Sequence, residues 1–512
     1  MINVLQMLQR SASLYPDAEA FRDPASSVTF SELKSRSERI GTYLLRGGVT
    51  DGDGIAFFME KCVDVLPVMF GSVYANAFYS FIDIRQPKER TLSIVRTLSP
   101  AFLITDEANE GQLPDELKEY PSVKILRIED LKDLSERGDL DEDLLQSASG
   151  RFFDLLPLYV NFTSGSTGVP KGVAVSHRSV IDFIETFTGT FGITSEDVLA
   201  NQAPFDFDVS VKDIYSGLYT GASVALIPRE YFSNPTLLMD YLCEVNATVL
   251  IWAVSAMCFV TIMNALDYKV PEKLRIIMFS GEVMPIKQLN KWKKYLPDAT
   301  YVNLYGPTEI TCNCTYHILN REYEPGETIP IGIPFPNEKV FLLDADDRLI
   351  TGPDTEGEIC VAGTCLALGY FKAPAKTDDV FTQNPVNEKF YERIYRTGDL
   401  GKYNEELELI YIGRKDFQVK HMGQRIELGD IESAAMALEG IERACCLYDS
   451  VHKKIILFYT GPLEKELIPD RIREKLPPFM IPNKTIRLNV FPMTKNGKID
   501  RVALLEHIRK QP

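Results

Sequence analysis

Apolar runs of four to six residues alternate with longer segments of helical periodicity through the first 300 residues of the chain. The runs predict strands at 54–58, 102–105, 123–128, 223–227, 249–252 and 276–279. The periodic segments predict helices at 63–76, 87–98, 236–244 and 285–295. Strands that alternate with helices in this way are typical of α/β layers.

The pattern changes from about residue 339, where closely spaced strands follow one another with turns between them. A mainly β subdomain is expected there, and the best domain boundary lies near 413–416. Beyond that boundary the chain predicts a helix at 432–438, strands at 444–448 and 455–459, and a helix at 464–476. The 96 residues from 417 to 512 suffice for a small α+β domain. We therefore expect one domain over 1–413, a short connection at 414–416 and a second domain over 417–512.

Composition narrows the range of partners. The chain has 72 acidic and 55 basic side chains and a net charge of −17, which disfavours nucleic acid as a partner because nucleic-acid binding rests on a basic surface. The nine cysteines and five histidines are scattered without metal-ligand spacing. Neither a signal peptide nor an apolar run long enough to span a bilayer is recognisable, so we expect a cytoplasmic protein without membrane insertion.

The richest segment for chemistry is 161–172, which holds three glycines, four hydroxyl side chains and a lysine. Glycines allow backbone N–H groups to turn toward an anion, and the hydroxyls and the lysine add donors and charge. The order of residues is not that of a Walker A loop. The segment therefore predicts a polyphosphate-binding loop rather than a Ser/Gly-rich surface loop. Its candidate ligands are Thr163, Ser164, Gly165, Ser166, Thr167, Gly168 and Lys171.

Four later segments narrow the choice of protein family. They read Tyr-Gly-Pro-Thr-Glu at 305–309, Tyr-Arg-Thr-Gly-Asp at 395–399, Gly-Arg-Lys-Asp at 413–416 and Thr-Lys-Asn-Gly-Lys-Ile-Asp-Arg at 494–501. Each one alone is compatible with an ordinary turn. Together with the loop at 161–172, in this order and spacing, they resemble the adenylate-forming enzymes, the superfamily of acyl- and aryl-CoA synthetases, nonribosomal-peptide adenylation domains and luciferases. The resemblance covers essentially the whole chain.

The resemblance implies a fold and a nucleotide site. It implies a large AMP-binding domain of two layered α/β sheets with a β subdomain, and a small mobile domain joined by a hinge at Asp416. ATP and magnesium are the expected ligands. The residues that the resemblance assigns to ATP or AMP, besides the loop, are Gly281, Glu282, Asn303, Tyr305, Gly306, Thr308, Asp399 and Arg414. Tyr305 would stack on adenine, Asp399 would accept the ribose hydroxyls, and Glu309 would hold Mg²⁺, which prefers oxygen ligands.

The resemblance also implies a reaction. A carboxylate attacks the α-phosphorus of ATP, pyrophosphate leaves, and Lys498 offsets the repulsion between the two anions. In this family the small domain then rotates about the hinge, and a thiol, normally the phosphopantetheine arm of a carrier protein, takes the acyl group.

The segment at 201–212 is similar to the family's substrate segment, and Asp208 falls where members that activate amino acids keep a carboxylate for the α-ammonium. The remaining pocket residues by the same resemblance are Val209, Lys212, Trp252, Met278, Ser280, Leu304, Cys312 and Asn313. The pattern is most similar to ligases that load D-alanine onto a carrier protein. Ser280 and Lys212 depart from it. A Lys212 that points inward would suit an acidic or polar substrate side chain, whereas one that points outward is a solvated helix lysine.

We therefore expect an ATP-dependent amino acid–carrier protein ligase, with D-alanine as the leading substrate. The main alternative is a stand-alone nonribosomal-peptide adenylation enzyme for another amino acid. An acyl-CoA synthetase is a further alternative, against which Asp208 speaks, and a nucleotide-binding protein without catalysis is the last.

Overall fold

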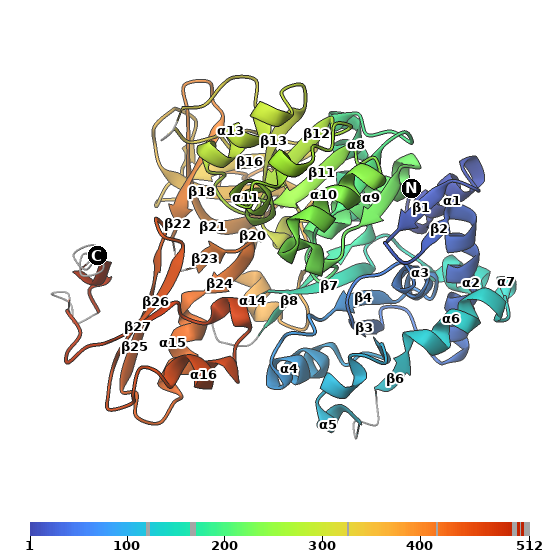
Figure 1. The fold of residues 1–512 in the computed structure, drawn as a ribbon, viewed down its shortest axis with the longest axis horizontal. Helices are drawn as coiled ribbons and strands as arrows, with labels where there is room; N and C mark the ends of the chain where they lie inside the picture. The colour runs from blue at the N-terminus through green and yellow to red at the C-terminus, as the bar shows by residue number, and fades with distance from the viewer. Residues whose placement is uncertain are drawn as a thin grey trace.

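The structure is a computed structural model that describes residues 1–118, 123–163, 170–324, 327–415, 418–493, 499–501 and 503–505. Two large sheets and their helices make up most of the molecule, and a β-rich region and a smaller C-terminal part lie beside them (Figure 1). This arrangement confirms the mixed α/β class expected from the alternation of strands and helices.

The larger sheet has nine strands in the order β15-β14-β13-β12-β11-β9-β10-β1-β2. Their bounds are Glu19–Arg22 (β1), Ser27–Thr29 (β2), Val198–Asn201 (β9), Ser223–Leu226 (β10), Val249–Ala253 (β11), Ile276–Ser280 (β12), Thr300–Tyr305 (β13), Thr315–Ile318 (β14) and Ile333–Pro334 (β15). The strands from β1 across to β13 pair in parallel, and β11 and β12 are buried at every position. The carboxyl ends of β9, β11, β12 and β13 therefore meet at one edge, where ligands of such sheets bind.

The second sheet has seven strands in the order β19-β8-β7-β4-β3-β5-β6. Their bounds are Gly54–Phe58 (β3), Phe78–Phe81 (β4), Phe102–Thr105 (β5), Lys124–Arg127 (β6), Pro157–Thr163 (β7), Lys171–Ser176 (β8) and Gly369–Tyr370 (β19). The five strands from β6 to β7 are parallel, whereas β7 and β8 form an antiparallel pair. The ends of the predicted phosphate loop are thus the ends of β7 and β8.

Helices cover the faces of both sheets. Helices α3 (Val65–Tyr74), α8 (His177–Phe191) and α9 (Val209–Thr220) contribute to the apolar core that both sheets share, together with α1 (Leu5–Leu14) and α2 (Phe30–Arg46). The opposite face of the nine-stranded sheet packs against α10 (Pro235–Glu244), α11 (Val254–Ile262), α12 (Ala265–Tyr268) and α13 (Ile286–Tyr295). The opposite face of the seven-stranded sheet packs against α4 (Lys88–Leu98) and α5 (Asp115–Lys118). At the periphery lie α6 (Ile128–Arg137) and α7 (Glu142–Arg151).

The β subdomain expected after residue 339 is a six-stranded antiparallel sheet. Its strands are Glu338–Leu343 (β16), Leu349–Ile350 (β17), Gly357–Gly363 (β18), Phe381–Gln383 (β20), Arg393–Tyr403 (β21) and Leu409–Arg414 (β22), with helix α14 at Pro374–Asp378. Arg414 closes the last strand and pairs with Asp399 of β21.

The C-terminal part is α+β, as expected. It begins with a two-stranded hairpin, Gln418–His421 (β23) and Gln424–Glu427 (β24). It continues with α15 (Leu428–Met436), β25 (Arg443–Asp449), β26 (Lys454–Thr460), α16 (Ile468–Arg473) and β27 (Lys484–Arg487). Ile431 and Ile468 of the two helices pack on one face of the three-stranded sheet, and Ile499 packs on the other. The boundary near 413–416 stays a prediction, and Asp416 lies outside the described residues.

Most elements expected from periodicity are present, with ends shifted by one or two residues. The expected strands at 54–58 and 102–105 are β3 and β5 without any shift. The helix expected at 432–438 instead begins at Leu428, and the one expected at 464–476 spans only Ile468–Arg473. No helix within the described residues is long and apolar enough to cross a membrane.

Candidate functional site

The candidate site lies where the carboxyl ends of β12 and β13 meet the β23–β24 hairpin. A cavity of about 70 Å³ opens there. Ten predicted residues from separate segments line it: Asp208, Val209, Ser280, Gly281, Gly306, Thr308, Cys312, Asn313, Asp399 and Arg414. The hairpin closes the cavity from the other side with Gln418, Val419, Lys420, Gly423 and Arg425. The fold therefore gathers the predicted substrate and ribose residues around one space.

A second cavity of about 500 Å³ adjoins the first, since both are lined by Gly281 and Arg414. Its wall holds the other residues predicted for the base, which are Glu282, Asn303 and Tyr305, and also Leu304. The side-chain amide of Asn303 donates to the carbonyl oxygen of Pro330 at 2.8 Å, which fixes the orientation of the amide.

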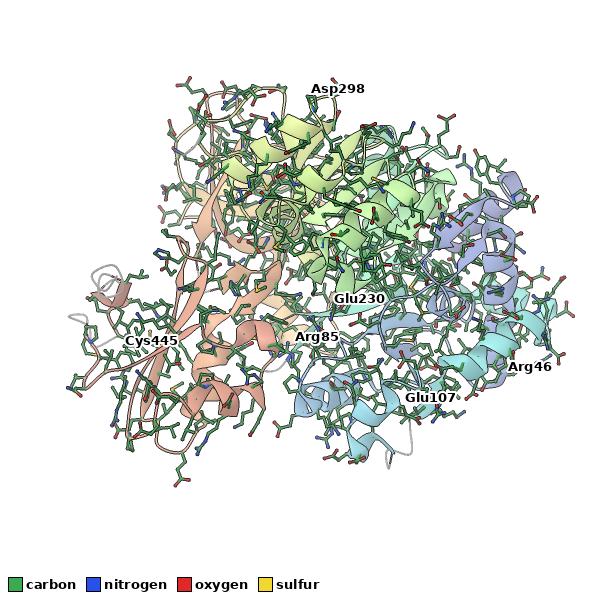
Figure 2. All side chains as sticks on the ribbon, in the orientation of Figure 1. Arg46, Arg85, Glu107, Glu230, Asp298 and Cys445 are labelled. Carbon is green, nitrogen blue, oxygen red and sulfur yellow. The ribbon has the colours of Figure 1, made fainter. Side chains whose placement is uncertain are left out.

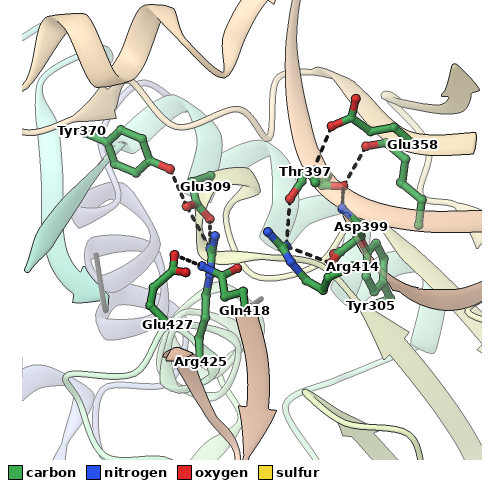
Figure 3. Close-up of polar contacts among 12 residues, drawn as sticks. Tyr305, Glu309, Glu358, Tyr370, Thr397, Asp399, Arg414, Gln418, Arg425 and Glu427 are labelled. Atoms are coloured by element: carbon green, nitrogen blue, oxygen red, sulfur yellow. Dashed lines mark hydrogen bonds and ion pairs between the residues drawn. The ribbon is translucent and has the colours of Figure 1, made fainter. Parts of the chain in front are cut away.

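Asp399 sits between two predicted partners. One carboxylate oxygen accepts from the hydroxyl of Tyr305 at 2.5 Å, and the other accepts from Arg414 Nη1 at 2.8 Å (Figure 3). Arg414 also donates to the carbonyl oxygen of Thr397 at 2.9 Å. Burial, followed by the negative charge of Asp399, raises the pKa of Tyr305 well above its ordinary value, so the hydroxyl stays protonated and donates. The arrangement presents a buried carboxylate beside an aromatic ring, which is what a ribose and its base require.

Glu309, the predicted magnesium ligand, lies in the single 3₁₀ turn Thr308–Ile310 and is buried. Both of its oxygens accept from Arg425 Nη1 of the hairpin, at 2.9 and 2.8 Å, and one also accepts from the hydroxyl of Tyr370 at 2.8 Å (Figure 3). Burial alone would raise the pKa of Glu309, but the charge of Arg425 and the hydrogen bond from Tyr370 outweigh it and lower the pKa.

This arrangement does not fit a magnesium ion at Glu309, because Arg425 already neutralises the carboxylate. In the described part of the chain, no three His, Cys, Asp or Glu side chains gather where they could hold a metal. The predicted metal role of Glu309 stays a prediction that requires Arg425 to leave.

The ends of the predicted phosphate loop face each other, because Thr163 of β7 pairs with Lys171 of β8. The ammonium of Lys171 lies 5.4 Å from the ring centre of Tyr370, the same residue that donates to Glu309. Burial and then the charge of Arg425 lower the pKa of Lys171. The end of the loop at Lys171 thus lies near Glu309. The predicted residues that lie outside the described residues are Ser164, Gly165, Ser166, Thr167, Gly168, Asp416 and Lys498.

Asp208 immediately precedes α9, yet among the described residues its carboxylate makes no capping hydrogen bond to that helix. The side chain is buried and lines the smaller cavity. Burial raises the pKa of Asp208, while the hydroxyl of Thr308 and the charges of Lys212 and Lys420 oppose the rise. A cap role therefore does not explain this carboxylate, which is available to a cation in the cavity.

Lys212 points inward, which decides the orientation that the sequence left open. The side chain is fully buried, and Nζ donates to Asn313 Oδ1 at 2.5 Å. Asn313 lines the cavity, so Lys212 stands directly behind its wall.

Two other predicted pocket residues belong to the core in this structure. The indole N–H of Trp252 donates to the carbonyl oxygen of Ala200 at 2.8 Å, and its ring meets Phe232 edge-on. Met278 packs in the core between the sheets. Neither residue is among the described residues that line the two cavities, whereas Val209, Ser280, Leu304, Cys312 and Asn313 are.

The residues that sequence reasoning missed lie mainly on the β23–β24 hairpin. Lys420 is half-buried and lines both cavities, and the negative charges of Asp399 and Asp208 act on it. At the turn, the N–H of Gly423, with φ of +78°, donates to Glu282 at 2.5 Å. A signal was present, since a glycine divides two short runs directly after the Gly-Arg-Lys-Asp segment.

The fold agrees with what comparison with known proteins finds. The family model described as AMP-binding enzyme matches residues 8–371, and the chain belongs to this family. Tyrocidine synthase 1 of Brevibacillus parabrevis is 30% identical over 98% of this chain, and the match spans 45% of that protein. The L-proline–[L-prolyl-carrier protein] ligase of Streptomyces coelicolor is 32% identical over 92% of this chain and 91% of its own length.

Solved structures share the architecture. The structure of holo-PA1221, an NRPS protein containing adenylation and PCP domains bound to a vinylsulfonamide inhibitor, superposes with a TM-score of 0.81. It is 25% identical, and the match covers 99% of this chain and 84% of that one. The o-succinylbenzoate CoA synthetase of Bacillus subtilis has the same fold, with a TM-score of 0.82 at 18% identity over 99% of this chain and 98% of that one.

Proposed function

We propose that this enzyme activates an amino acid with ATP as an aminoacyl-adenylate, releases pyrophosphate, and transfers the aminoacyl group to the phosphopantetheine thiol of a carrier protein. The observation that carries the proposal is the buried carboxylate of Asp208 in the same cavity as Asp399. A buried carboxylate needs a cationic partner, and the α-ammonium of an amino acid supplies one. The likeness to a carrier protein ligase and to peptide synthases supports the same class.

In this proposal ATP lies across the two cavities. Adenine stacks on Tyr305 in the larger cavity, the ribose hydroxyls donate to Asp399, and the α-phosphate reaches Thr308 in the smaller one. The loop that connects β7 and β8 would hold the β- and γ-phosphates. Lys498 would bridge the substrate carboxylate and the α-phosphate. Magnesium would accompany the phosphates, whereas Glu309 is paired with Arg425 here.

Two candidates remain for the amino acid. D-alanine follows from the resemblance of the sequence to D-alanine–carrier protein ligases. Another amino acid, with an acidic or polar side chain, is favoured by one observation, the inward orientation of the buried Lys212.

Amino-acid-dependent exchange of pyrophosphate into ATP tests the proposal, with a panel of D-Ala, L-Ala, Ser, Asp and Glu. We expect strong exchange with at least one of them. Asp208→Asn should lower that exchange on the order of 100-fold, because hydrogen bonds to charged groups contribute about 1.5–3 kcal/mol.

The matched control is Asp298→Asn, which changes an exposed carboxylate at the periphery of the molecule and should leave exchange unaffected (Figure 2). Activity with carboxylic acids and free CoA, without any amino-acid-dependent exchange, would instead identify an acyl-CoA synthetase. ATP binding without exchange for any acid would contradict an enzymatic role.

A further inference from the structure

Lys212 and Asp208 lie one helical turn apart at the start of α9, on the same side of the helix. Asp208 lines the smaller cavity directly, and Lys212 reaches its wall through Asn313. A negative side chain thus lines the cavity, and a positive side chain stands directly behind its wall at Asn313.

The ammonium of Lys212 has fewer acceptors than a buried lysine requires. An ammonium has three N–H donors, and within the part of the chain that the structure describes, Nζ finds one acceptor, Asn313 Oδ1 at 2.5 Å. No described carboxylate lies within 4 Å of it. Burying a charge is costly unless the charge is paired and hydrogen-bonded. The site therefore lacks an acceptor that a ligand can supply.

Lys61 shows how this fold satisfies another lysine with acceptors from the protein alone. Its ammonium donates to four oxygens at 2.7–3.1 Å, which are the side-chain oxygen of Asn201 and the carbonyl oxygens of Asn201, Gln202 and Ala203. Lys61 is half-buried and has four acceptors, whereas the fully buried Lys212 has one among the described residues. The number of acceptors therefore distinguishes Lys212 from Lys61.

The charges around the cavity also favour a ligand that supplies a negative acceptor group. The side-chain amide of Asn201 donates to Asp213 at 2.8 Å and its oxygen accepts from Lys61, so Asp213 belongs to the Lys61 network. The charges of Lys61 and Lys212 act on Asp213, and those of Lys212 and Lys420 act on Asp208. An amino acid brings one more ammonium next to Asp208, while its α-carboxylate turns toward the ATP phosphates. A second carboxylate on the substrate would supply a negative partner for the buried Lys212.

The backbone around Asn313 is held in an unusual conformation. Thr311 and Cys312 both have left-handed φ angles, 52° and 76°, although neither is glycine. Such strain persists where surrounding contacts hold it, and here Cys312 Sγ donates to the carbonyl oxygen of Asp208 at 3.1 Å. The turn places Cys312 and Asn313 side by side in the cavity wall.

We propose that the amino acid activated by this enzyme has a side-chain carboxylate, as aspartate and glutamate do, and that Lys212 and Asn313 select it. The α-ammonium pairs with Asp208, and the side-chain carboxylate accepts from Lys212 Nζ and from the amide of Asn313. The inference rests on the proposed function and makes an aliphatic substrate such as D-alanine a poor one, because a methyl group adds no acceptor to the one that Asn313 gives the Lys212 ammonium.

Pyrophosphate exchange with Asp, Glu, Asn, Gln, Ser and both alanine enantiomers tests the selection. We expect the highest kcat/KM for Asp or Glu, and a value on the order of 100-fold lower for alanine, because a site built to hydrogen-bond its substrate rejects an analogue without the acceptor. Lys212→Met keeps the length of the side chain and removes the charge. It should reduce the preference for the acid over its amide on the order of 100-fold. Lys273→Met, at an exposed lysine, is the matched control and should leave the preference unchanged.

A binding measurement on the wild-type enzyme decides the matter even if Lys212→Met fails to fold. Calorimetry would compare sulfamoyl-adenosine mimics of the adenylates that carry glutamate, aspartate or alanine. We expect an acidic mimic to bind at least about 100-fold tighter than the alanine mimic. A preference for alanine or for an amide, or a Lys212→Met profile equal to that of the wild type, would overturn the proposal while leaving amino-acid activation intact. Absence of exchange and of mimic binding for every amino acid would overturn both.

Discussion

At the scale of single residues, Asp399 and Tyr305 share one short hydrogen bond but have separable roles in the proposed nucleotide site. A carboxylate accepts from both ribose hydroxyls, whereas an amide turns a donor toward one of them. Asp399→Asn should therefore raise the KM for ATP by about 10- to 100-fold, since hydrogen bonds to charged groups contribute about 1.5–3 kcal/mol. Tyr305→Phe keeps the ring and loses only the hydroxyl, so its effect should stay below about 10-fold, as expected for one hydrogen bond of about 1 kcal/mol.

Exchange kinetics at varied ATP and saturating amino acid would measure both variants. Equal effects of the two changes would contradict the stacking role, because they would mean that the hydroxyl itself contacts the nucleotide.

The sequence indicated the types of site residue better than their pairings. Tyr305, Asp399 and Arg414 could be assigned because each lies in a short motif whose residues are contiguous. The pairing of Glu309 with Arg425 joins residues 116 positions apart, and that of Lys212 with Asn313 joins residues 101 positions apart. Periodicity describes faces of single elements and carries no information on such long-range contacts, so the partner of each charge became visible only in the fold.

At the scale of elements, the β23–β24 hairpin inserts a positive side chain where sequence reasoning placed a metal. Arg425→Gln would leave the buried Glu309 carboxylate without its cation, and breaking a buried ion pair costs about 3–5 kcal/mol. We expect the hairpin to leave the cavity in this variant. Transfer of the aminoacyl group to a carrier thiol should then fall at least about 100-fold, because loss of the ion pair destabilises the docked position of the hairpin. Pyrophosphate exchange does not need the docked hairpin, so its decrease should be at least tenfold smaller than the decrease in transfer.

Rapid quench of a preformed adenylate with a carrier protein that bears a free phosphopantetheine thiol would measure transfer, and Arg425→Lys is the matched control. Lysine keeps the charge but cannot reproduce the planar, two-pronged donor geometry of the guanidinium. The transfer rate of Arg425→Lys should therefore lie between those of the wild type and Arg425→Gln. If exchange declined as much as transfer, the hairpin would serve the first step as well.

At the scale of the whole molecule, the architecture could be predicted where strands are short, buried and flanked by helices. Every position of β11 and β12 is buried, and such continuous apolar runs stand out in a sequence. The hairpin could not be predicted in this way, because Gln418–His421 and Gln424–Glu427 are four-residue strands rich in polar side chains. Their stability comes from docking on Glu282 and Glu309, contacts that depend on how the C-terminal part meets the sheets.

The β23–β24 hairpin and Ile499 belong to opposite faces of the C-terminal part. The hairpin contacts the cavity, and its Ile426 packs on the face of the three-stranded sheet that α15 covers. Met493 and Ile499 form a β-bridge with each other, and Ile499 packs on the opposite face of that sheet. In Figure 1 the hairpin strands lie between the large sheets and β25–β27. One orientation of this part therefore offers the hairpin to the cavity, and we propose that a rotation near Asp416 offers the 494–498 segment instead.

Lys498→Ala tests this alternation. If Lys498 acts only while the carboxylate attacks ATP, the variant should lose on the order of 100-fold or more in exchange, since removing one donor of this kind costs about 2.7–4 kcal/mol. Transfer from a preformed adenylate should keep at least about half of its wild-type rate, because the hairpin then faces the cavity and a residue absent from a transition state does not change its barrier. This is the reverse of the pattern expected for Arg425→Gln, so the two variants together separate the steps. Equal loss of both half-reactions in Lys498→Ala would mean that one orientation performs the whole reaction, and the rotation would have to be abandoned.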